Sequence, residues 1–264
     1  TARGPKSQGR TRDNAPSDSE RNTIMKVTLI SSTPDAAELL IFTKSTRLTM
    51  SPGLFADIMA WPEERKLEEL EYMAGTIPSS WEFVDYVFMV EDVSRAYTHQ
   101  QVRTRAASYA QQTMRVLPMH GFGYVYSDRV RADQRAKQEV DAALRVIQQT
   151  YDDLVQVVGL PPEDARGILP TNIATNIVCK FNLRTMTELA RSRTGGRTQG
   201  EYQKVVNAMI DAVLAVHPWA EKFLFPKGRD HFAAIEAWAL KKFPDDLLAR
   251  GEILKIIDAM RKEA

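Results

Sequence analysis

Residues 94–115 read SRAYTHQQVRTRAASYAQQTMR, which combines cations, amides and hydroxyls in one segment. The segment holds four arginines and no Asp or Glu. A surface helix usually mixes both charge signs for solubility, so a helix that carries only positive charge is suited to an anionic partner. We therefore predict an arginine-rich helix over residues 95–115 that binds a phosphorylated ligand.

The composition of the whole chain limits what this ligand is. Its 264 residues, of which 44% are hydrophobic, are enough to bury a substantial core in one large domain or two small ones. The formal net charge is only +1, whereas a protein that coats nucleic acid nonspecifically is normally more basic. The arginines therefore indicate a local pocket for a small phosphorylated molecule, and neither nucleic acid nor a membrane is expected as a partner.

The cysteine and histidine content argues against a metal centre and against disulfides. Cys179 is the single cysteine of the chain, which excludes an internal disulfide and a multi-cysteine metal site and is consistent with a reducing cytosol. No apolar run approaches the ~18 residues of a membrane span, and no signal peptide is recognisable. We expect a soluble, cytoplasmic protein without a metal. The histidines have no spacing typical of metal ligands; they are His99, His120, His217 and His231.

The first 23 residues contain no large apolar side chain, so ordering them would bury too little surface to offset the loss of conformational entropy. We predict a disordered tail over residues 1–24 and one folded domain over residues 25–264. A nucleic-acid-binding arm is a weaker alternative, because Asp13, Asp18 and Glu20 dilute the positive charge of the tail. No linker rich in Pro, Ser or Gly divides the domain.

Hydrophobic periodicity predicts an α+β fold in which helices dominate. Strands are expected where apolar residues alternate or where β-branched and aromatic residues gather, and helices where apolar residues recur every three or four positions. The expected strands cover residues 26–31, 82–90 and 171–181. The expected helices, besides the arginine-rich one, cover residues 36–44, 62–74, 131–157, 183–193 and 199–216.

The arginine-rich segment resembles the signature of the flavin-dependent thymidylate synthases. In that family a Gln is followed three residues later by Arg-His-Arg, then by a Ser and by a polar run that ends in Ser-x-Arg. Here Gln100, Arg103-Thr104-Arg105, Ser108 and residues 111–115 stand at that spacing, with Thr104 in place of the His. Arg-x-Arg alone is common, so the resemblance depends on further segments.

Further segments match the same family in the same order, and together they extend the resemblance over about residues 25–220. They correspond to a loop-and-Glu element, to Ala-Arg-x-x-Leu-Pro-x-Asn, to Asn-x-Arg with a later Arg, and to Ala-Gln-x-Glu-Ile. In this chain these segments are residues 79–83, residues 166–172, residues 182–184 with Arg193, and residues 199–202.

The resemblance implies a helix-rich α+β fold with a central mixed or antiparallel sheet, and a homotetramer. It implies that NADPH reduces FAD, that methylenetetrahydrofolate supplies one carbon, and that dUMP becomes dTMP. A reduced flavin then replaces the cysteine nucleophile of the unrelated classical thymidylate synthases. This agrees with the position of Cys179 in an apolar, strand-like stretch, which is typical of a packed small hydrophobe.

The resemblance also implies a role for each matched residue. Arg193 is the expected catalytic residue, because a cation there would stabilise charge that develops on the uracil ring. Guanidinium groups and hydroxyls suit the phosphate dianion of dUMP, and the residues at substrate positions are Gln100, Arg103, Gln111, Thr113, Met114, Arg115, Arg166 and Arg193. The residues at FAD positions are Ser79, Glu82, Arg103, Thr104, Arg105, Asn182, Arg184 and Glu188.

Three of these residues also have an ordinary structural interpretation. Asn182 is equally suited to cap the helix that follows it. Arg184 is also typical of a solvated helix face, and Glu82 of a carboxylate paired with a nearby cation. The sequence alone leaves both interpretations open for each residue.

Departures from the family pattern leave the reaction itself open. Thr104 replaces the signature His, Ala110 an Asn, and Glu188 an Asn or His, so FAD binding is expected to be altered. Capture of water in place of hydride would give hydroxymethyl-dUMP instead of dTMP. A catalytically silent flavin or nucleotide sensor is a second alternative. RNA binding by residues 95–115 is a third, and it would leave the other matched segments without an explanation.

Overall fold

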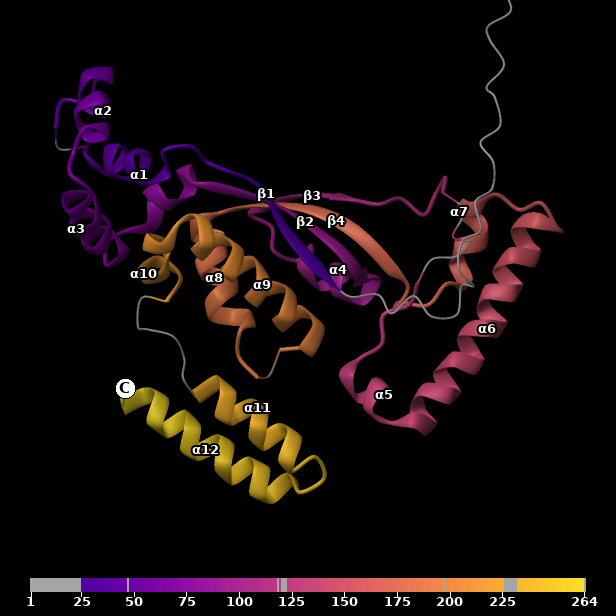
Figure 1. Cartoon of the computed structure of the whole chain (residues 1–264). Helices are drawn as coiled ribbons and strands as arrows, with labels where there is room; N and C mark the ends of the chain where they lie inside the picture. The colour runs from indigo at the N-terminus through magenta and orange to yellow at the C-terminus, as the bar shows by residue number, and fades with distance from the viewer. Residues whose placement is uncertain are drawn as a thin grey trace, which may run out of the picture.

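The computed structural model describes residues 25–46, 48–117, 119, 123–196, 198–225 and 232–263. The predicted tail over residues 1–24 lies outside these ranges, and so do His120 and His231. A four-stranded sheet forms the centre of the fold, and helices gather below it and at both of its ends (Figure 1).

The sheet is antiparallel throughout and has the strand order β1-β2-β4-β3, which confirms the predicted α+β class. β2 has a bulge where Asp92 adopts a left-handed backbone conformation with a φ of 56°. Asn176 on β4 holds this conformation, because its side-chain oxygen accepts a 3.0 Å hydrogen bond from the Asp92 N–H. The strands are β1 (Lys26–Ser32), β2 (Asp85–Ser94), β3 (Ala107–Gln111) and β4 (Ala174–Asn182).

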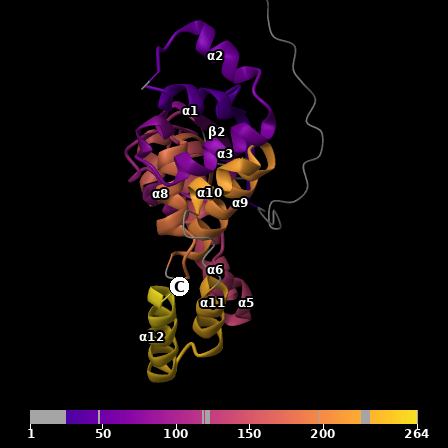
Figure 2. The same cartoon turned by 90° about the vertical axis from the view of Figure 1, so that its left-hand side faces the viewer.

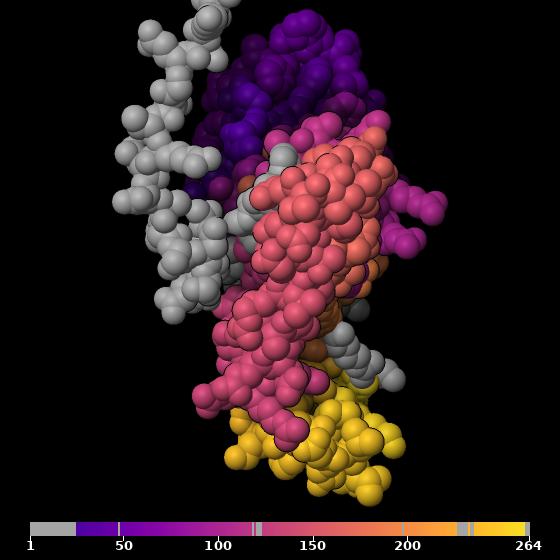
Figure 3. All heavy atoms as spheres, turned by 90° about the vertical axis from the view of Figure 1, so that its right-hand side faces the viewer, coloured from indigo at the N-terminus to yellow at the C-terminus, as the bar shows by residue number. Residues whose placement is uncertain are grey.

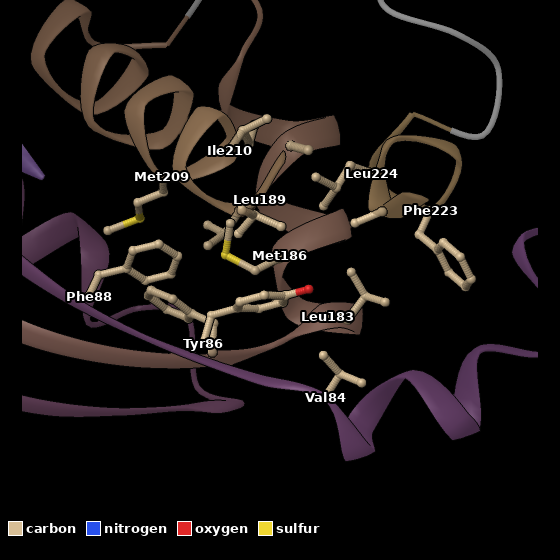
Figure 4. Close-up of a cluster of buried hydrophobic side chains, with 14 of the residues drawn as sticks. Val84, Tyr86, Phe88, Leu183, Met186, Leu189, Met209, Ile210, Phe223 and Leu224 are labelled. Carbon is tan, nitrogen blue, oxygen red and sulfur yellow. The ribbon is translucent and has the colours of Figure 1, made fainter. Parts of the chain in front are cut away.

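Two helices cover one face of the sheet, α8 (Leu183–Arg193) and α9 (Gly200–Val216). Tyr86 and Phe88 on β2 point toward Met186 on α8 and Met209 on α9, and all four side chains are fully buried (Figure 4). The residue between the two aromatic residues on β2 faces the other way and is only half-buried. Burial of each large apolar side chain contributes about 1.5–3 kcal/mol, which fixes both helices on this face.

The N-terminal helices pack at one end of the sheet. Lys66 and Glu38 form a mostly buried ion pair between two of these helices, with Nζ and Oε1 2.6 Å apart. The ring of Trp81 packs edge-on against Phe223, with centroids 5.0 Å apart, so a later segment joins the same end. The elements here are α1 (Ala36–Lys44), α2 (Pro52–Met59), α3 (Glu63–Ala74), the 3-10 helices η1 (Pro78–Phe83) and η3 (Pro218–Ala220), and α10 (Glu221–Leu224).

A long helix dominates the other end of the molecule. α6 (Gln134–Gln156) forms a ridge along the face seen in Figure 3. Its Tyr151 is fully buried in a small core with Ala165 and Ile173, and its hydroxyl accepts a 3.0 Å hydrogen bond from the Met119 N–H. This core fixes the segment that carries Arg166 next to the start of β4. The neighbouring elements are α5 (Asp128–Ala132), α7 (Pro162–Ala165) and the 3-10 helix η2 (Arg166–Ile168).

The last two helices, α11 (Phe232–Lys242) and α12 (Leu247–Glu263), form a hairpin beyond the other helices (Figure 2). Arg261 Nη2 lies 2.6 Å from Glu236 Oε2 and joins the two helices. A Cβ atom on Gly196 would lie 3.1 Å from Glu236 Cγ, so the connection between α8 and α9 contacts α11 closely. Hydrophobic periodicity did not predict this hairpin.

The prediction of a single helix over residues 95–115 is wrong. α4 covers only Arg95–Gln101, and after a turn the chain continues as β3. β3 pairs with β4 and places Tyr109 opposite Cys179. Its side chains alternate between half-buried and exposed, a period of two that suits a strand at the sheet edge. The arginines therefore project from a helix, a turn and a strand end.

The other predicted elements are confirmed, with shifts of a few residues at their ends. The largest shift concerns the strand predicted over residues 82–90, which covers Asp85–Ser94. Pro78–Phe83 form η1 instead, because a proline at the helix start favours a helical turn and Trp81 is buried within it.

Candidate functional site

The loop between α4 and β3 is held from two sides. Tyr109 Oη on β3 lies 2.8 Å from two backbone carbonyl oxygens, those of Gln101 and Thr104. Burial raises the pKa of Tyr109 to about 12, so its hydroxyl stays protonated at neutral pH. Thr185 Oγ1 in the first turn of α8 donates a 3.0 Å hydrogen bond to the Ala106 carbonyl oxygen. β3 and α8 therefore fix the backbone that carries the signature arginines.

This loop and the second half of α8 line a cavity of about 380 Å³. Three guanidinium groups and two hydroxyls face a single carboxylate, so the lining favours an anionic ligand. Five predicted site residues from two distant segments meet here: Arg103, Thr104, Arg105, Glu188 and Arg193. The remaining lining residues are Ala106, Leu189 and Ser192.

Arg193, the last residue of α8, lies against the first turns of α9. Its guanidinium carbon is 5.0 Å from the centroid of the Tyr202 ring, within the range of a cation–π interaction. Tyr202 is fully buried, and its ring packs edge-on against Tyr97 of α4 with centroids 5.3 Å apart. Its hydroxyl has no hydrogen-bond partner among the described residues. Two aromatic rings in the core thus support the guanidinium at the rim of the cavity.

Gln100 lies outside the cavity lining, at the contact between α4 and the start of α9. Its Nε2 donates a hydrogen bond to Gln199 Oε1. Gln203 Nε2 donates a 2.6 Å hydrogen bond to the Thr194 carbonyl oxygen, directly after Arg193. Amide side chains therefore connect the ends of three helices beside the cavity.

Glu82 and Arg184 form an exposed ion pair at the N-terminus of α8, with Arg184 Nη1 2.6 Å from Glu82 Oε1. Arg184 Nε also lies 3.8 Å from Glu188 Oε1, one turn along the helix. Exposed ion pairs of this kind contribute only about 0–1 kcal/mol to stability, so a phosphate could compete for the arginine at little cost. The pairing that the sequence left open for Glu82 is observed.

Asn182 caps α8, because its Oδ1 accepts a 2.9 Å hydrogen bond from the Thr185 N–H. Ser79 is exposed in η1. Neither residue lines the cavity, and neither do Glu82 and Arg184. A contact of these four residues with FAD stays a prediction.

A second group of predicted residues meets at Glu163 on α7. Arg115 Nε lies 2.5 Å from Glu163 Oε2, and Arg166 Nε donates a 3.2 Å hydrogen bond to the Glu163 carbonyl oxygen. Thr113 Oγ1 accepts a 3.1 Å hydrogen bond from the Arg115 N–H. A guanidinium has five N–H donors, so one bond to Glu163 leaves each arginine with donors for a phosphate.

Gln111 and Met114 occupy the same segment but have different surroundings. Gln111 Nε2 lies 2.9 Å from Thr98 Oγ1 and 3.5 Å from Thr175 Oγ1, so two hydroxyls orient its amide. Met114 is half-buried and packs against the small core around Tyr151. The position of Met114 is typical of a structural side chain, and a role for it in substrate binding stays a prediction.

Two polar residues near the start of α4 were not predicted from the sequence as site residues, Arg95 on α4 and Glu201 on α9. Arg95 Nη2 donates a 2.8 Å hydrogen bond to the Gln112 carbonyl oxygen. Glu201 accepts hydrogen bonds from the Ser94 N–H at 2.7 Å and from Ser94 Oγ at 2.6 Å. Arg95 belongs to the quoted arginine-rich segment and Glu201 to a matched segment, so both carried a signal without an assigned role.

Cys179 is unsuited to a nucleophilic role. It is fully buried in the central strand β4, and burial raises the pKa of its thiol to about 12. Within the described ranges of the chain, no group of three or more His, Cys, Asp or Glu is arranged to hold a metal ion. Over the same ranges no helix combines the length and the apolar character needed to cross a membrane.

The region that holds this site matches a known family. A family model described as Thymidylate synthase complementing protein matches residues 28–219. The chain belongs to this family. The matched residues include the cavity and the cluster at Glu163, whereas α11 and α12 follow after the match ends.

Individual relatives agree with the family match. The chain is 33% identical over 141 residues to the flavin-dependent thymidylate synthase of Sulfurisphaera tokodaii, a match that covers 53% of this chain and 54% of that protein. It is 28% identical over 219 residues to the flavin-dependent thymidylate synthase of Clostridium tetani, which covers 76% of this chain and 87% of that protein. The chain therefore spans about half the length of the first of these relatives and most of the second.

The fold also has a counterpart among solved structures. It resembles the crystal structure of the UMP/dUMP methylase PolB from Streptomyces cacaoi bound with 5-Br dUMP, with a TM-score of 0.63 and 16% identity. The likeness covers 78% of this chain and 96% of that one. At this identity it establishes the shared fold, and the activity of this chain is considered separately below.

Proposed function

We propose that this chain is a flavin-dependent thymidylate synthase, which converts dUMP to dTMP with methylenetetrahydrofolate as carbon donor and NADPH as reductant of a bound FAD. The observation that carries the proposal is the cavity that gathers Arg103, Arg105 and Arg193 within the region matched by the family. The relatives named above are flavin-dependent thymidylate synthases, which supports the same reaction here.

The cavity suits the diphosphate of FAD. Its guanidinium groups and the hydroxyls of Thr104 and Ser192 are donors, which a diphosphate requires. A volume of about 380 Å³ is near the lower end of the ~300–1,000 Å³ typical of ligand pockets, so part of the cofactor would extend beyond it. Other copies of the chain would cover that part in a homotetramer. Bound FAD would supply the redox chemistry that makes a cysteine nucleophile unnecessary.

The cluster at Glu163 suits the phosphate of dUMP. Arg115 and Arg166 can present guanidinium forks to a phosphate dianion, and Thr113 adds a hydroxyl. Gln111, whose amide Thr98 orients, would then contact the nucleotide. Arg193 would stabilise the charge that develops on the uracil ring during the reaction. PolB is named a UMP/dUMP methylase, so UMP is the second nucleotide to be tested.

The test begins with the purified full-length protein. Bound FAD should give a yellow colour and an absorbance band in the visible range. NADPH oxidation in the presence of methylenetetrahydrofolate should depend on dUMP, and mass spectrometry of the nucleotide should detect dTMP. Arg135→Ala on the exposed face of α6 serves as a control that keeps activity, because Arg135 lies outside the cavity lining and the Glu163 cluster.

The product decides between the proposals. A mass that corresponds to hydroxymethyl-dUMP would assign water capture in place of hydride transfer and would overturn thymidylate synthesis. FAD binding without nucleotide-dependent NADPH oxidation would instead identify a silent flavin or nucleotide sensor. A protein that retains no FAD after unbound FAD has been removed would contradict both flavin-dependent reactions and a flavin sensor.

A further inference from the structure

The turn that follows Arg193 is held between two helices. On one side, Gln203 Nε2 of α9 donates a 2.6 Å hydrogen bond to the Thr194 carbonyl oxygen. On the other side, the backbone of Gly196 lies against α11 of the C-terminal hairpin. Figure 1 shows the connection between α8 and α9 directly above α11. The hairpin therefore contacts the chain three residues after a residue that lines the cavity.

The absence of a side chain at Gly196 permits this close approach. A Cβ atom there would lie 3.1 Å from Glu236 Cγ, 3.4 Å from Glu236 Cδ and 3.4 Å from the Ala237 nitrogen. Carbon atoms pack best about 3.5–4.0 Å apart, so a larger residue would push α11 away from the turn. At Gly195, by contrast, a Cβ atom would meet no other atom within 4 Å. Neither glycine has a positive φ, so the backbone accepts a side chain at both positions.

The burial pattern of α11 follows this contact. Glu236 is only 2% exposed, whereas Ile235 and Trp238 on the same helix are 48% and 55% exposed. A carboxylate is almost never fully buried unless it is paired. Here Arg261 of α12 is a partner, with Nη2 2.6 Å from Glu236 Oε2. The hairpin thus turns a paired carboxylate toward Gly196 and leaves apolar side chains exposed, the reverse of what hydrophobic burial alone favours.

Arg193 depends on the geometry of the same turn. It is the last residue of α8, and the ring of Tyr202 on α9 orients its guanidinium at the cavity. A shift of the turn would move the end of α8 relative to α9, and the guanidinium with it. Misplacement of a reacting group by about 1 Å can cost about 100-fold in rate. The position of α11 therefore bears on the chemistry of the cavity.

We propose that the C-terminal hairpin positions Arg193, with Gly196 and Glu236 as positioning residues that act through the turn between α8 and α9. The hairpin follows the residues that the family model matches, so this support comes from a part of the chain outside the matched region. The inference deepens the proposed function and rests on it for the reaction that Arg193 serves. The contact between the hairpin and the turn does not depend on that reaction.

The test compares Gly196→Val with the matched control Gly195→Val in the full-length protein at saturating FAD. Gly196→Val should lower kcat about 10-fold because Arg193 is displaced. The Michaelis constant for dUMP should stay unchanged, because the residues proposed to hold its phosphate lie at Glu163. Gly195→Val should keep both constants.

Hydrogen exchange of the α11 amides shows whether the hairpin has moved. Exchange should become faster in Gly196→Val and stay at the wild-type rate in Gly195→Val. Equal losses of kcat in the two variants would overturn the inference. So would a loss of kcat without faster exchange, or faster exchange without a loss of kcat.

A smaller change replaces Gly196→Val if that variant does not fold. Gly196→Ala adds only the Cβ atom that would meet Glu236, and Glu236→Ala removes the Cγ and Cδ atoms in its way. Each single variant should have a lower kcat than the wild type. In the Glu236→Ala background, Gly196→Ala should cause no further loss, because the close contact is gone. Losses that add in the double variant would contradict a coupling between the two residues.

Chemical modification of Arg193 separates this inference from the proposed function. Phenylglyoxal reacts with accessible guanidinium groups, and mass spectrometry of the peptide that carries Arg193 measures the rate. The rate should rise in Gly196→Val but not in Gly195→Val. If it does, and the wild type forms no dTMP, the proposed function fails and the positioning of Arg193 stands. If the wild type forms dTMP and all three proteins are modified at one rate, the inference fails and the proposed function stands.

Discussion

The guanidinium carbon of Arg193 lies 5.0 Å from the centroid of the Tyr202 ring, and this contact fixes the cation at the rim of the cavity. A cation–π interaction contributes about 0.5–2 kcal/mol and requires the ring rather than the hydroxyl. The Tyr202 hydroxyl has no hydrogen-bond partner among the described residues. The ring alone is therefore expected to matter for Arg193.

Replacement of the ring should lower turnover, whereas loss of the hydroxyl should not. We expect Tyr202→Leu to reduce kcat about 10-fold, because the guanidinium loses the surface that orients it. Tyr202→Phe keeps the ring and should retain the wild-type kcat and Michaelis constant. Steady-state kinetics at saturating FAD measure kcat and the Michaelis constant of each variant. Thermal melts show whether Tyr202→Leu also destabilises the fold. Equal losses in the two variants would show that the hydroxyl, not the ring, is what Arg193 needs.

Arg193 and Arg115 should affect different kinetic constants. Arg115 is proposed to hold the phosphate of dUMP, a contact that would be the same in ground and transition state, so Arg115→Ala should mainly raise the Michaelis constant for dUMP. Arg193→Ala should lower turnover by roughly 100-fold or more, the scale for one lost charge-stabilising donor. The exposed pair of Arg115 with Glu163 adds little stability, so melting temperatures should be unchanged. A pure affinity change in Arg193→Ala would move the assigned role to Arg103.

Thr104→His should strengthen FAD retention. Thr104 lines the cavity where the family signature has a His, and its backbone carbonyl stays bound to Tyr109 whatever its side chain. An imidazole there adds a ring and a hydrogen-bonding nitrogen near the cofactor. Fluorescence titration of apoprotein with FAD measures the affinity, and Thr150→His on the exposed face of α6 is the matched control. Unchanged FAD affinity in Thr104→His would argue that Thr104 does not face the flavin.

His217 should make stability depend on pH. Burial lowers the pKa of His217 below its ordinary value of 6.5, so the unfolded chain takes up a proton at a higher pH than the folded chain. The free energy of unfolding should therefore be complete above pH ~6.5 and fall as the pH drops below it toward the lowered folded value. Urea melts between pH ~7.5 and ~5.5 measure this slope. It should be smaller in His217→Asn and retained in the control His99→Asn, and a slope lost in both would exclude His217 as its cause.

Parts of the fold were readable from the sequence because one-sided burial leaves a clear period. The helix over 134–156 has that period, whereas the strand over 85–94 is predicted from its β-branched and aromatic residues; both predictions agree with the structure within a few residues. Residues 107–111 alternate as well, but Tyr109 is the only large apolar side chain among their half-buried positions. The strand signal is therefore weak, and the surrounding arginines favour the prediction of a helix for this segment.

The sequence predicted which residues belong to the candidate site but not which of them lie close together in space. The resemblance named Arg103, Arg105 and Arg193, and the cavity contains all three. It could not show that Arg115 pairs with Glu163, because this ion pair joins residues 48 positions apart in the sequence. Hydrogen bonds between residues that are far apart in the sequence decide such contacts, and no local pattern records them.

Because the thiol of Cys179 is buried, its alkylation reports how often the central sheet becomes exposed to solvent. A thiol that lies in the central strand and stays protonated at neutral pH cannot react with an alkylating reagent until β4 leaves the sheet. Because the chain has one cysteine, each molecule that opens gains a single mass increment. The rate of labelling then follows the exposure of the sheet that supports both arginine groups, and no cysteine needs to be introduced. Ligands that bind the folded chain should lower the rate of Cys179 alkylation, and tighter ligands should lower it more.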